Sequence, residues 1–98
     1  MTTAITVVYK YLAPEASSTN DIHDIPITTT TKTLTLDEML ALHPRDEIIT
    51  LLANDPEEYG EGPKEYKVQY RLGPNLIGSR DHGVALWALF VIVTDPDA

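Results

Sequence analysis

The chain has 98 residues, of which 43% are hydrophobic and 22% are charged, and its formal net charge at neutral pH is −8. This size predicts a single domain over residues 1–98, and this composition supports a folded core rather than a disordered chain. The absence of cysteine excludes disulfides and zinc–thiolate sites. The negative charge argues against binding to nucleic acid or to an anionic membrane, because proteins contact both through lysine and arginine.

No segment predicts export or membrane insertion. The apolar stretch near the N-terminus is short, and no basic residues precede it as they would in a secretory signal. The longest apolar run, Val84 to Val93, has ten residues, about half of the roughly 20 that a spanning helix needs. We therefore expect a cytoplasmic protein.

The first third of the chain predicts two strands. Residues 3–12 alternate, with Ile5, Val7 and Tyr9 on one face. After a polar loop, residues 25–34 are rich in threonine, which favours extended backbone. This second strand buries little and contains a proline, so we expect it at an edge of the sheet.

Two short helices are predicted next. Thr35 and Glu38 match a capping box, and the helix that they begin should end near Leu42, because Pro44 disfavours helical backbone at the residue before it. A second helix is expected to begin at Pro44. Its apolar face, at helical spacing, would consist of Ile48, Ile49, Leu51 and Leu52. An acidic loop over residues 55–64 follows.

Two further strands are expected in the C-terminal part. Residues 65–72 alternate strictly, and the side chains expected to face the core are those of Tyr66, Val68, Tyr70 and Leu72. A long turn over residues 73–83 leads to a strand over residues 84–94 that is apolar on both faces. Such a strand is typical of the centre of a sheet that is covered on both sides.

The predicted fold is therefore α+β, with a four-stranded mixed sheet and a short broken helix pair on one face. The elements follow one another as β-β-α-α-β-β. With the threonine-rich strand at an edge and the last strand in the centre, the pattern fits the spatial order 2-1-4-3. That is the order of β-grasp folds, a likeness of pattern alone.

The sheet face away from the helices is expected to need a partner. The two helices cover one face, and no remaining segment is large enough to cover the other, unless the loops over residues 13–24 and 73–83 close it. Apolar patches left in water usually mark an interface, so we expect a homodimer or another protein here. The residues expected to form this surface are Trp87, Leu89 and Val91 on the last strand and Leu76 and Ile77 on the preceding turn.

A second candidate surface is acidic. Residues 37–65 hold nine acids and two bases, which accounts for −7 of the net charge of −8. Such a run is either solvated surface or a docking face for a basic partner. The candidates for the docking face are Asp55, Glu57, Glu58 and Glu61.

No catalytic, cofactor or metal motif stands out. The segment Asp-Ile-His-Asp over residues 21–24 has metal-ligand types, but it does not supply the three or four ligands of a protein site alone. Ser-Arg-Asp-His over residues 79–82 contains the residue types of a hydrolase triad, which meet through the fold and not as neighbours on one loop. We therefore expect no enzyme activity, no cofactor and no metal.

These features predict a small acidic, non-catalytic protein-binding module that occludes a surface of a macromolecular target. An inhibitor or immunity-type protein of phage or mobile-element origin is the kind of protein expected. Its partner would be another protein with a basic surface. The alternative is a self-assembling structural subunit, such as a virion component, in which the edge strand and the apolar face make repeated contacts.

Overall fold

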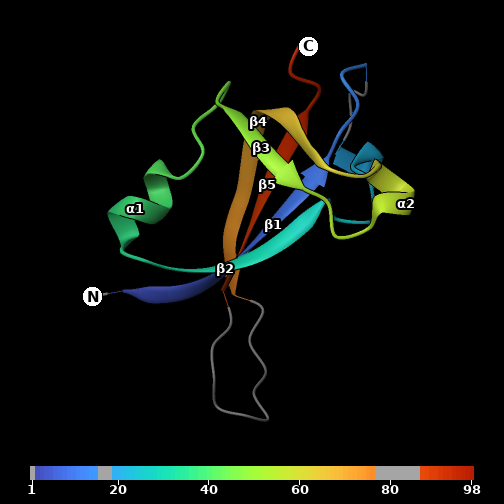
Figure 1. Ribbon diagram of the computed structural model, residues 1–98. Helices are drawn as coiled ribbons and strands as arrows, with labels where there is room; N and C mark the ends of the chain where they lie inside the picture. Colours follow the sequence, from blue (N-terminus) through green and yellow to red (C-terminus); the bar gives the residue numbers. More distant parts are fainter. Residues whose placement is uncertain (1, 16–18, 77–86) are drawn as a thin grey trace.

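The computed structural model describes residues 2–15, 19–76 and 87–98, which form one sheet flanked by short helices (Figure 1). The strands are β1 (Thr3–Tyr11), β2 (Thr28–Leu34), β3 (Ile48–Leu52), β4 (Pro63–Leu76) and β5 (Trp87–Thr94). The helices are α1 (Leu36–Ala41) and α2 (Pro56–Tyr59), together with a short 3₁₀ turn, η1 (Thr19–Asp21).

The strands pair in the order β2-β1-β5-β4-β3. β1 and β5 run parallel, and the other neighbours are antiparallel. The α+β class and the mixed sheet are confirmed, and the four strands predicted from the sequence keep their 2-1-4-3 order as β2-β1-β5-β4. The number of strands was wrong, because β3 adds a fifth strand beside β4.

β3 occupies the residues for which the sequence predicts a second helix, and that prediction is wrong. Its isoleucine and threonine residues favour extended backbone, and its burial alternates along the strand, so Ile49 and Leu51 pack against the core. Between α1 and β3, His43 and Asp46 have positive φ angles of 50° and 71°. This left-handed backbone turns the chain and prevents a helix from starting there.

The N-terminus of α1 is formed as the sequence predicts. The Thr35 hydroxyl accepts a hydrogen bond from the Glu38 N–H at 3.2 Å, and the Glu38 carboxylate accepts one from the Thr35 N–H at 2.9 Å. The capping box is therefore confirmed. The two bonds satisfy main-chain donors that the first turn of a helix leaves without partners.

The C-terminus of α1 is held by an arginine on the sheet. The Arg71 guanidinium, on β4, donates to the main-chain oxygens of Met39, Leu40 and Leu42 at 3.2, 2.7 and 2.9 Å. These carbonyls lie in the last turn and at the residue that follows it, where main-chain N–H partners run out, although the Met39 oxygen also accepts from the Leu42 N–H at 3.4 Å. One side chain thus anchors a six-residue helix that is too short to be stable alone.

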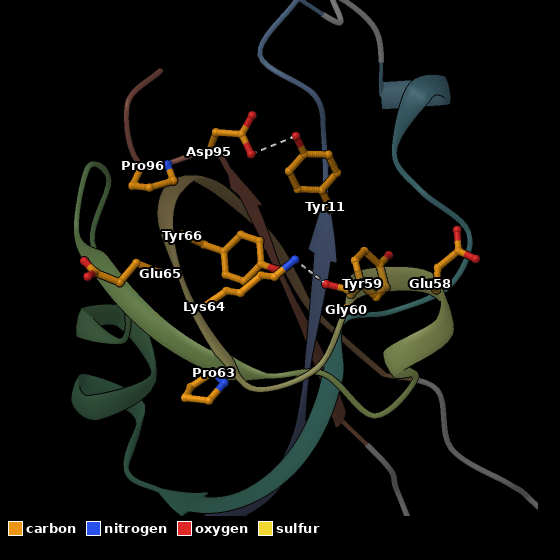
Figure 2. Close-up of a pocket in the computed structure, with 10 residues that line it drawn as sticks. All are labelled: Tyr11, Glu58, Tyr59, Gly60, Pro63, Lys64, Glu65, Tyr66, Asp95 and Pro96. Carbon is orange, nitrogen blue, oxygen red and sulfur yellow. Dashed lines mark hydrogen bonds between the residues drawn. The ribbon is translucent and has the colours of Figure 1, made fainter.

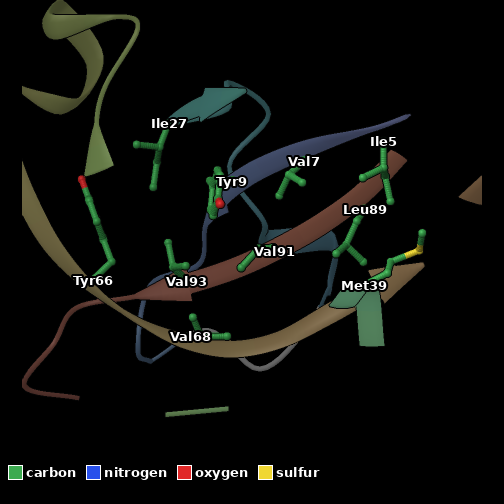
Figure 3. Close-up of a cluster of buried hydrophobic side chains, with 10 residues drawn as sticks. All are labelled: Ile5, Val7, Tyr9, Ile27, Met39, Tyr66, Val68, Leu89, Val91 and Val93. Carbon is green, nitrogen blue, oxygen red and sulfur yellow. The ribbon is translucent and has the colours of Figure 1, made fainter. Parts of the chain in front are cut away.

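The sheet coils around a core on one of its faces (Figure 3). Both edge strands bend toward this core, since Leu34 of β2 and Ile49 of β3 pack against it, and α1 inserts Met39. Burying side chains of this size contributes about 1.5–3 kcal/mol each. The buried core residues are Ile5, Val7, Tyr9, Ile27, Met39, Tyr66, Val68, Leu89, Val91 and Val93.

β4 is longer than predicted, and its side chains change face midway. Val68 lies opposite Val93, whereas Tyr70 lies opposite Ile92, so one residue between them is left unpaired in a bulge. The bulge turns Tyr70 and Leu72 to the face opposite the core, and Leu72 is 38% exposed. The prediction that these two side chains face the core is wrong, because it assumed unbroken alternation.

Candidate functional site

An open groove of about 760 Å³ lies at the end of the sheet where β1 and β5 finish and β4 begins (Figure 2). Three tyrosines from different elements line it. Tyr11 is the last residue of β1, Tyr59 ends α2, and Tyr66 is on β4. The chain after β5, at Asp95 and Pro96, completes the lining on another side. We call this feature the tyrosine groove.

Hydrogen bonds and ring contacts fix the three tyrosines. The Tyr11 hydroxyl donates to Asp95 Oδ1 at 3.0 Å, and the Tyr59 hydroxyl donates to the main-chain oxygen of Ile25. The rings of Tyr11 and Tyr66 meet edge to face, with centroids 6.3 Å apart and planes at 67°. Aromatic side chains that are already ordered lose little conformational entropy on binding.

These tyrosines remain neutral phenols across the physiological pH range. Burial raises the pKa of Tyr11 to about 12, and the hydrogen bond to Asp95 and its negative charge act in the same direction. Burial, with the charge of Glu58, raises the pKa of Tyr59 to about 12, and burial also raises the pKa of Tyr66. The groove therefore offers ring faces and hydroxyl groups, not a phenolate base or nucleophile.

Carboxylates border the groove. Glu58, Glu65 and Asp95 are among its lining residues, and Lys64 is the only lysine or arginine among them. The Lys64 ammonium donates to a main-chain oxygen of α2 at 2.5 Å, and Glu58 Oε1 lies 2.7 Å from Nε2 of His23. Negative charge around aromatic rings favours a cationic group over an anionic one.

The four acids predicted to form a docking face lie in and around α2, in different surroundings. Asp55 caps α2, because its carboxylate accepts a hydrogen bond from the Glu57 N–H at 3.1 Å. Glu58 lines the tyrosine groove, whereas Glu57 and Glu61 are exposed and do not line it. The Asp-Pro pair at residues 55–56 is a helix-start signal that would have assigned Asp55 to the cap.

The residues predicted to form an apolar partner surface are also placed differently. Leu89 and Val91 are 2% and 0% exposed in the core, and Trp87 packs against that core. The backbone of Leu76 pairs with Trp87, and Ile77 lies outside the described residues. The assignment of Leu89 and Val91 to an uncovered face is wrong, because β3 and the coiled edges of the sheet close over their side.

The opposite face of β5 is the one turned away from that core. It carries Ala88 and Ile92, each 0% exposed, and the half-buried Phe90. Part of the loop over residues 20–24 lies against this face and helps to line a hollow of about 450 Å³. The Lys10 ammonium lies 5.6 Å from the centroid of the Phe90 ring. A loop thus covers part of this face, as the alternative interpretation of the sequence allowed.

A chain of three polar side chains, which the sequence did not reveal, lies between β1 and the turn before β3. The Tyr9 hydroxyl is 2.6 Å from Nε2 of His43, and Nδ1 of His43 is 2.7 Å from the Glu47 carboxylate. A carboxylate only accepts, so Nδ1 carries the hydrogen and Nε2 of a neutral imidazole accepts from Tyr9. Tyr9 is only 4% exposed, and burial raises its pKa, so this chain fixes the turn and presents no nucleophile.

Metal-ligand side chains do not gather within the described ranges 2–15, 19–76 and 87–98, where no group of three or more could hold a metal ion. His23, in the segment considered as a metal site, pairs with Glu58, and residues 79–82 lie outside these ranges.

Within the described residues, no helix has the length and hydrophobicity needed to cross a membrane. Compared with protein-family models, with curated proteins and with solved structures, the chain has no match.

Proposed function

We propose that the protein is a non-catalytic protein-binding module whose tyrosine groove receives a lysine- or arginine-bearing segment of a target protein. The observation that supports this most directly is a groove in which three fixed tyrosines are bordered by Glu58, Glu65 and Asp95. By binding such a segment, the protein would cover part of the target's surface. That is the action of an inhibitor or immunity-type protein of phage or mobile-element origin.

The charge of the whole chain supports a basic partner. With a net charge of −8, the protein attracts positively charged proteins over several ångströms and repels other acidic ones. Glu57 and Glu61 do not line the groove, but they are exposed on the same acidic segment. In this proposal they increase the rate of encounter and contribute little to the bound contacts.

The individual contacts available in the groove are modest. A cation over a tyrosine ring contributes about 0.5–2 kcal/mol, and an exposed carboxylate pair contributes about 0.2–1 kcal/mol. A single lysine would therefore bind weakly. Micromolar affinity corresponds to a binding free energy of about −8 kcal/mol. A segment reaches this value only if several of its cations contact two or three of the rings and the carboxylates at the same time.

Fluorescence anisotropy with a labelled peptide of alternating arginine and alanine tests the proposal. The variant carries Glu58→Gln, Glu65→Gln and Asp95→Asn, which remove three charges from the groove and keep hydrogen-bonding groups of similar shape. We expect its Kd for the peptide to rise about tenfold, the result of losing about 1.4 kcal/mol. An unchanged Kd would contradict the proposal.

The matched control removes the same number of charges elsewhere. Asp21, Asp24 and Asp37 are exposed and do not line the groove, so changing them to asparagine alters the net charge equally. Peptide binding should weaken far less in this control than in the groove variant. Equal weakening would mean that the peptide senses only net charge, and the groove would have no specific role.

The alternative function, a self-assembling structural subunit, is favoured by the exposed edge strand β2. β2 ends the strand order, and its Thr29, Thr30, Thr31 and Thr33 are exposed. Its outer edge has no strand partner among the residues that the structure describes. Rings or larger closed assemblies in light scattering would favour this function, whereas an inhibitor would remain a monomer or a dimer.

A further inference from the structure

The edge strand β3 is short, but it lacks the charges and prolines that usually protect an edge. Its residues Ile48–Leu52 include no charged residue and no proline, although the chain carries a net charge of −8. It ends the strand order and pairs only with β4 within the described part of the chain. Natural edges are usually shielded by charges, prolines or bulges, because an unshielded edge pairs with another strand.

The main-chain groups of β3 alternate between its partner and its free edge. Glu47, just before β3, accepts from the Val68 N–H on β4 at 2.9 Å, so odd-numbered residues direct their hydrogen bonds toward β4. Asn54, just after β3, donates away from β4 to the Ile27 oxygen at 2.8 Å. The even-numbered residues between them therefore direct their N–H and C=O groups outward.

The same even-numbered residues also expose their side chains. Ile48 and Leu52 are 46% and 63% exposed, which is unusual for two large apolar residues on one strand, and Thr50 between them is exposed as well. A strand pairing with this edge would find outward backbone groups at all three positions and apolar side chains at Ile48 and Leu52.

We propose that β3 pairs antiparallel with β3 of a second copy of the chain, about a two-fold axis through Thr50. This register places Thr50 opposite Thr50 of the partner subunit, and Ile48 opposite Leu52 of the partner subunit. The outward backbone groups at these positions form the hydrogen-bonded pairs of an antiparallel ladder. The contact is isologous and therefore closes as a dimer. It differs from the homodimer that the sequence predicted through Trp87 and its neighbours.

The pattern of the strand itself favours a second copy as the occupant, because Ile48 and Leu52 lie symmetrically on either side of Thr50 and the outward residues therefore match those of an antiparallel copy. Two chains that each carry −8 repel one another over most of their surfaces and can approach closely where charge is absent, as it is along Ile48–Leu52. The register also sets Glu47 opposite Ala53 of the partner subunit, so no carboxylate meets another. The basic segment proposed for the tyrosine groove would find no acid on this strand.

The structure also limits how far the pairing extends. Beyond Leu52, the Asn54 N–H is already bonded to Ile27, and before Ile48 the positive φ of Asp46 turns the chain. An interface of five-residue strands falls at the small end of protein interfaces. We therefore expect a weak, concentration-dependent dimer.

Cysteine cross-linking tests the register directly, because the chain has no cysteine of its own. Opposed residues in a hydrogen-bonded antiparallel pair have Cα atoms about 5.5 Å apart, within disulfide range. Thr50→Cys should give a disulfide-linked dimer under mild oxidation. Thr30→Cys, exposed on the opposite edge strand β2, is the matched control and should remain mainly monomeric.

A mixed experiment distinguishes this register from a random collision. Ile48→Cys combined with Leu52→Cys should give mostly the mixed dimer, because the register places these two positions opposite one another. If Thr50→Cys cross-links no more than Thr30→Cys, or if the two homodimers form as readily as the mixed one, the proposed pairing is wrong.

Light scattering of the unmodified chain gives an independent measurement. The average mass should rise from 10.9 kDa toward twice that value as the protein concentration is raised. Leu52→Lys, which changes an exposed side chain, should keep the circular dichroism of the native chain and stay at the monomer mass. A native chain that stays monomeric, or a dimer that survives in Leu52→Lys, would overturn the proposal. Peptide binding in the tyrosine groove should be the same in both proteins.

Discussion

Asn54 and Ile27 join the two edges of the sheet. The Asn54 N–H donates to the Ile27 oxygen at 2.8 Å, and the Thr28 hydroxyl donates to the Asn54 side-chain oxygen at 3.3 Å. Asn54 follows the edge strand β3, and Ile27 precedes the edge strand β2. The coil of the sheet therefore brings the ends of its strand order together, and the Ile27 side chain, 0% exposed, fills the space beneath.

Ile27→Ala should be among the most destabilising single changes in the chain. It leaves a cavity where the two edges meet, and a change of this kind costs about 2–5 kcal/mol. Ile25→Ala, two residues earlier and 39% exposed, is the matched control and should cost less than about 1 kcal/mol. Urea unfolding measures the loss of unfolding free energy in both variants. Similar losses would show that burial of Ile27 at this junction does not stabilise the protein more than an exposed isoleucine does.

The strand pattern was predictable where alternation and β-branched residues agree. β1 and β2 lie where the sequence places them, and the capping box at Thr35 sets the start of α1. β3 was missed because Ile48, Ile49, Leu51 and Leu52 satisfy both helical and strand spacing. The deciding feature is the left-handed backbone at His43 and Asp46, before β3. Both residue types are enriched at positive φ, but most histidines and aspartates do not adopt it, so the sequence alone did not predict the turn.

The candidate site was less predictable, because it depends on where distant segments meet. The acidic segment drew attention to Glu58, but Tyr11 and Asp95 are near opposite ends of the chain and come together only through the parallel pairing of β1 and β5. Likewise, the sequence could not show which face of β5 packs in the core and which lies on the outer side of the sheet, since both faces are apolar. Which face became the core depended on β3, the element that was misassigned.

Arg71→Met should destabilise the protein through α1. The substitution keeps the length of the side chain but removes the hydrogen bonds to the oxygens of Met39, Leu40 and Leu42. We expect a loss of about 1–3 kcal/mol in unfolding free energy, since those oxygens lose a charged donor. The amide hydrogen of Met39, bonded to the Thr35 oxygen, should exchange faster. Arg45→Met, at an exposed position, should change neither quantity.

Tyr9 and Glu47 should be energetically coupled, although they are bonded to different nitrogens of His43. Tyr9→Phe removes the donor to Nε2, and Glu47→Ala removes the acceptor that orients the ring. Once either bond is lost, the imidazole is free to move and the other bond is weakened. A double-mutant cycle should give a coupling of about 0.5–3 kcal/mol. Replacing Glu47→Ala by Glu58→Ala in the cycle should give additive losses.

Asp55 should respond to substitution as a helix cap rather than as a docking residue. Asp55→Ala removes the acceptor for the Glu57 N–H and should cost about 0.5–2 kcal/mol of stability. Asp55→Asn keeps an acceptor at the same place and should be close to the native chain in urea unfolding. Asparagine also removes the charge of Asp55. Unchanged peptide binding in that variant would therefore show that Asp55 caps the helix and does not contribute to docking.

Alkaline pH should unfold the protein through its tyrosines. The pKa values of Tyr11 and Tyr59 are raised from 10.0 to about 12 in the folded chain. Between these values the unfolded state loses protons that the folded state keeps, so the unfolding free energy falls as pH rises. The contribution of these groups to the unfolding free energy is complete below pH 10 and is lost as pH approaches about 12.

Absorbance titration of tyrosinate in the folded chain should show phenols that ionise at higher pH than free tyrosine. Tyr11→Phe and Tyr59→Phe should each remove part of this late phase. If both variants titrate like the native chain apart from a smaller early phase, these two hydroxyls are not the protected ones.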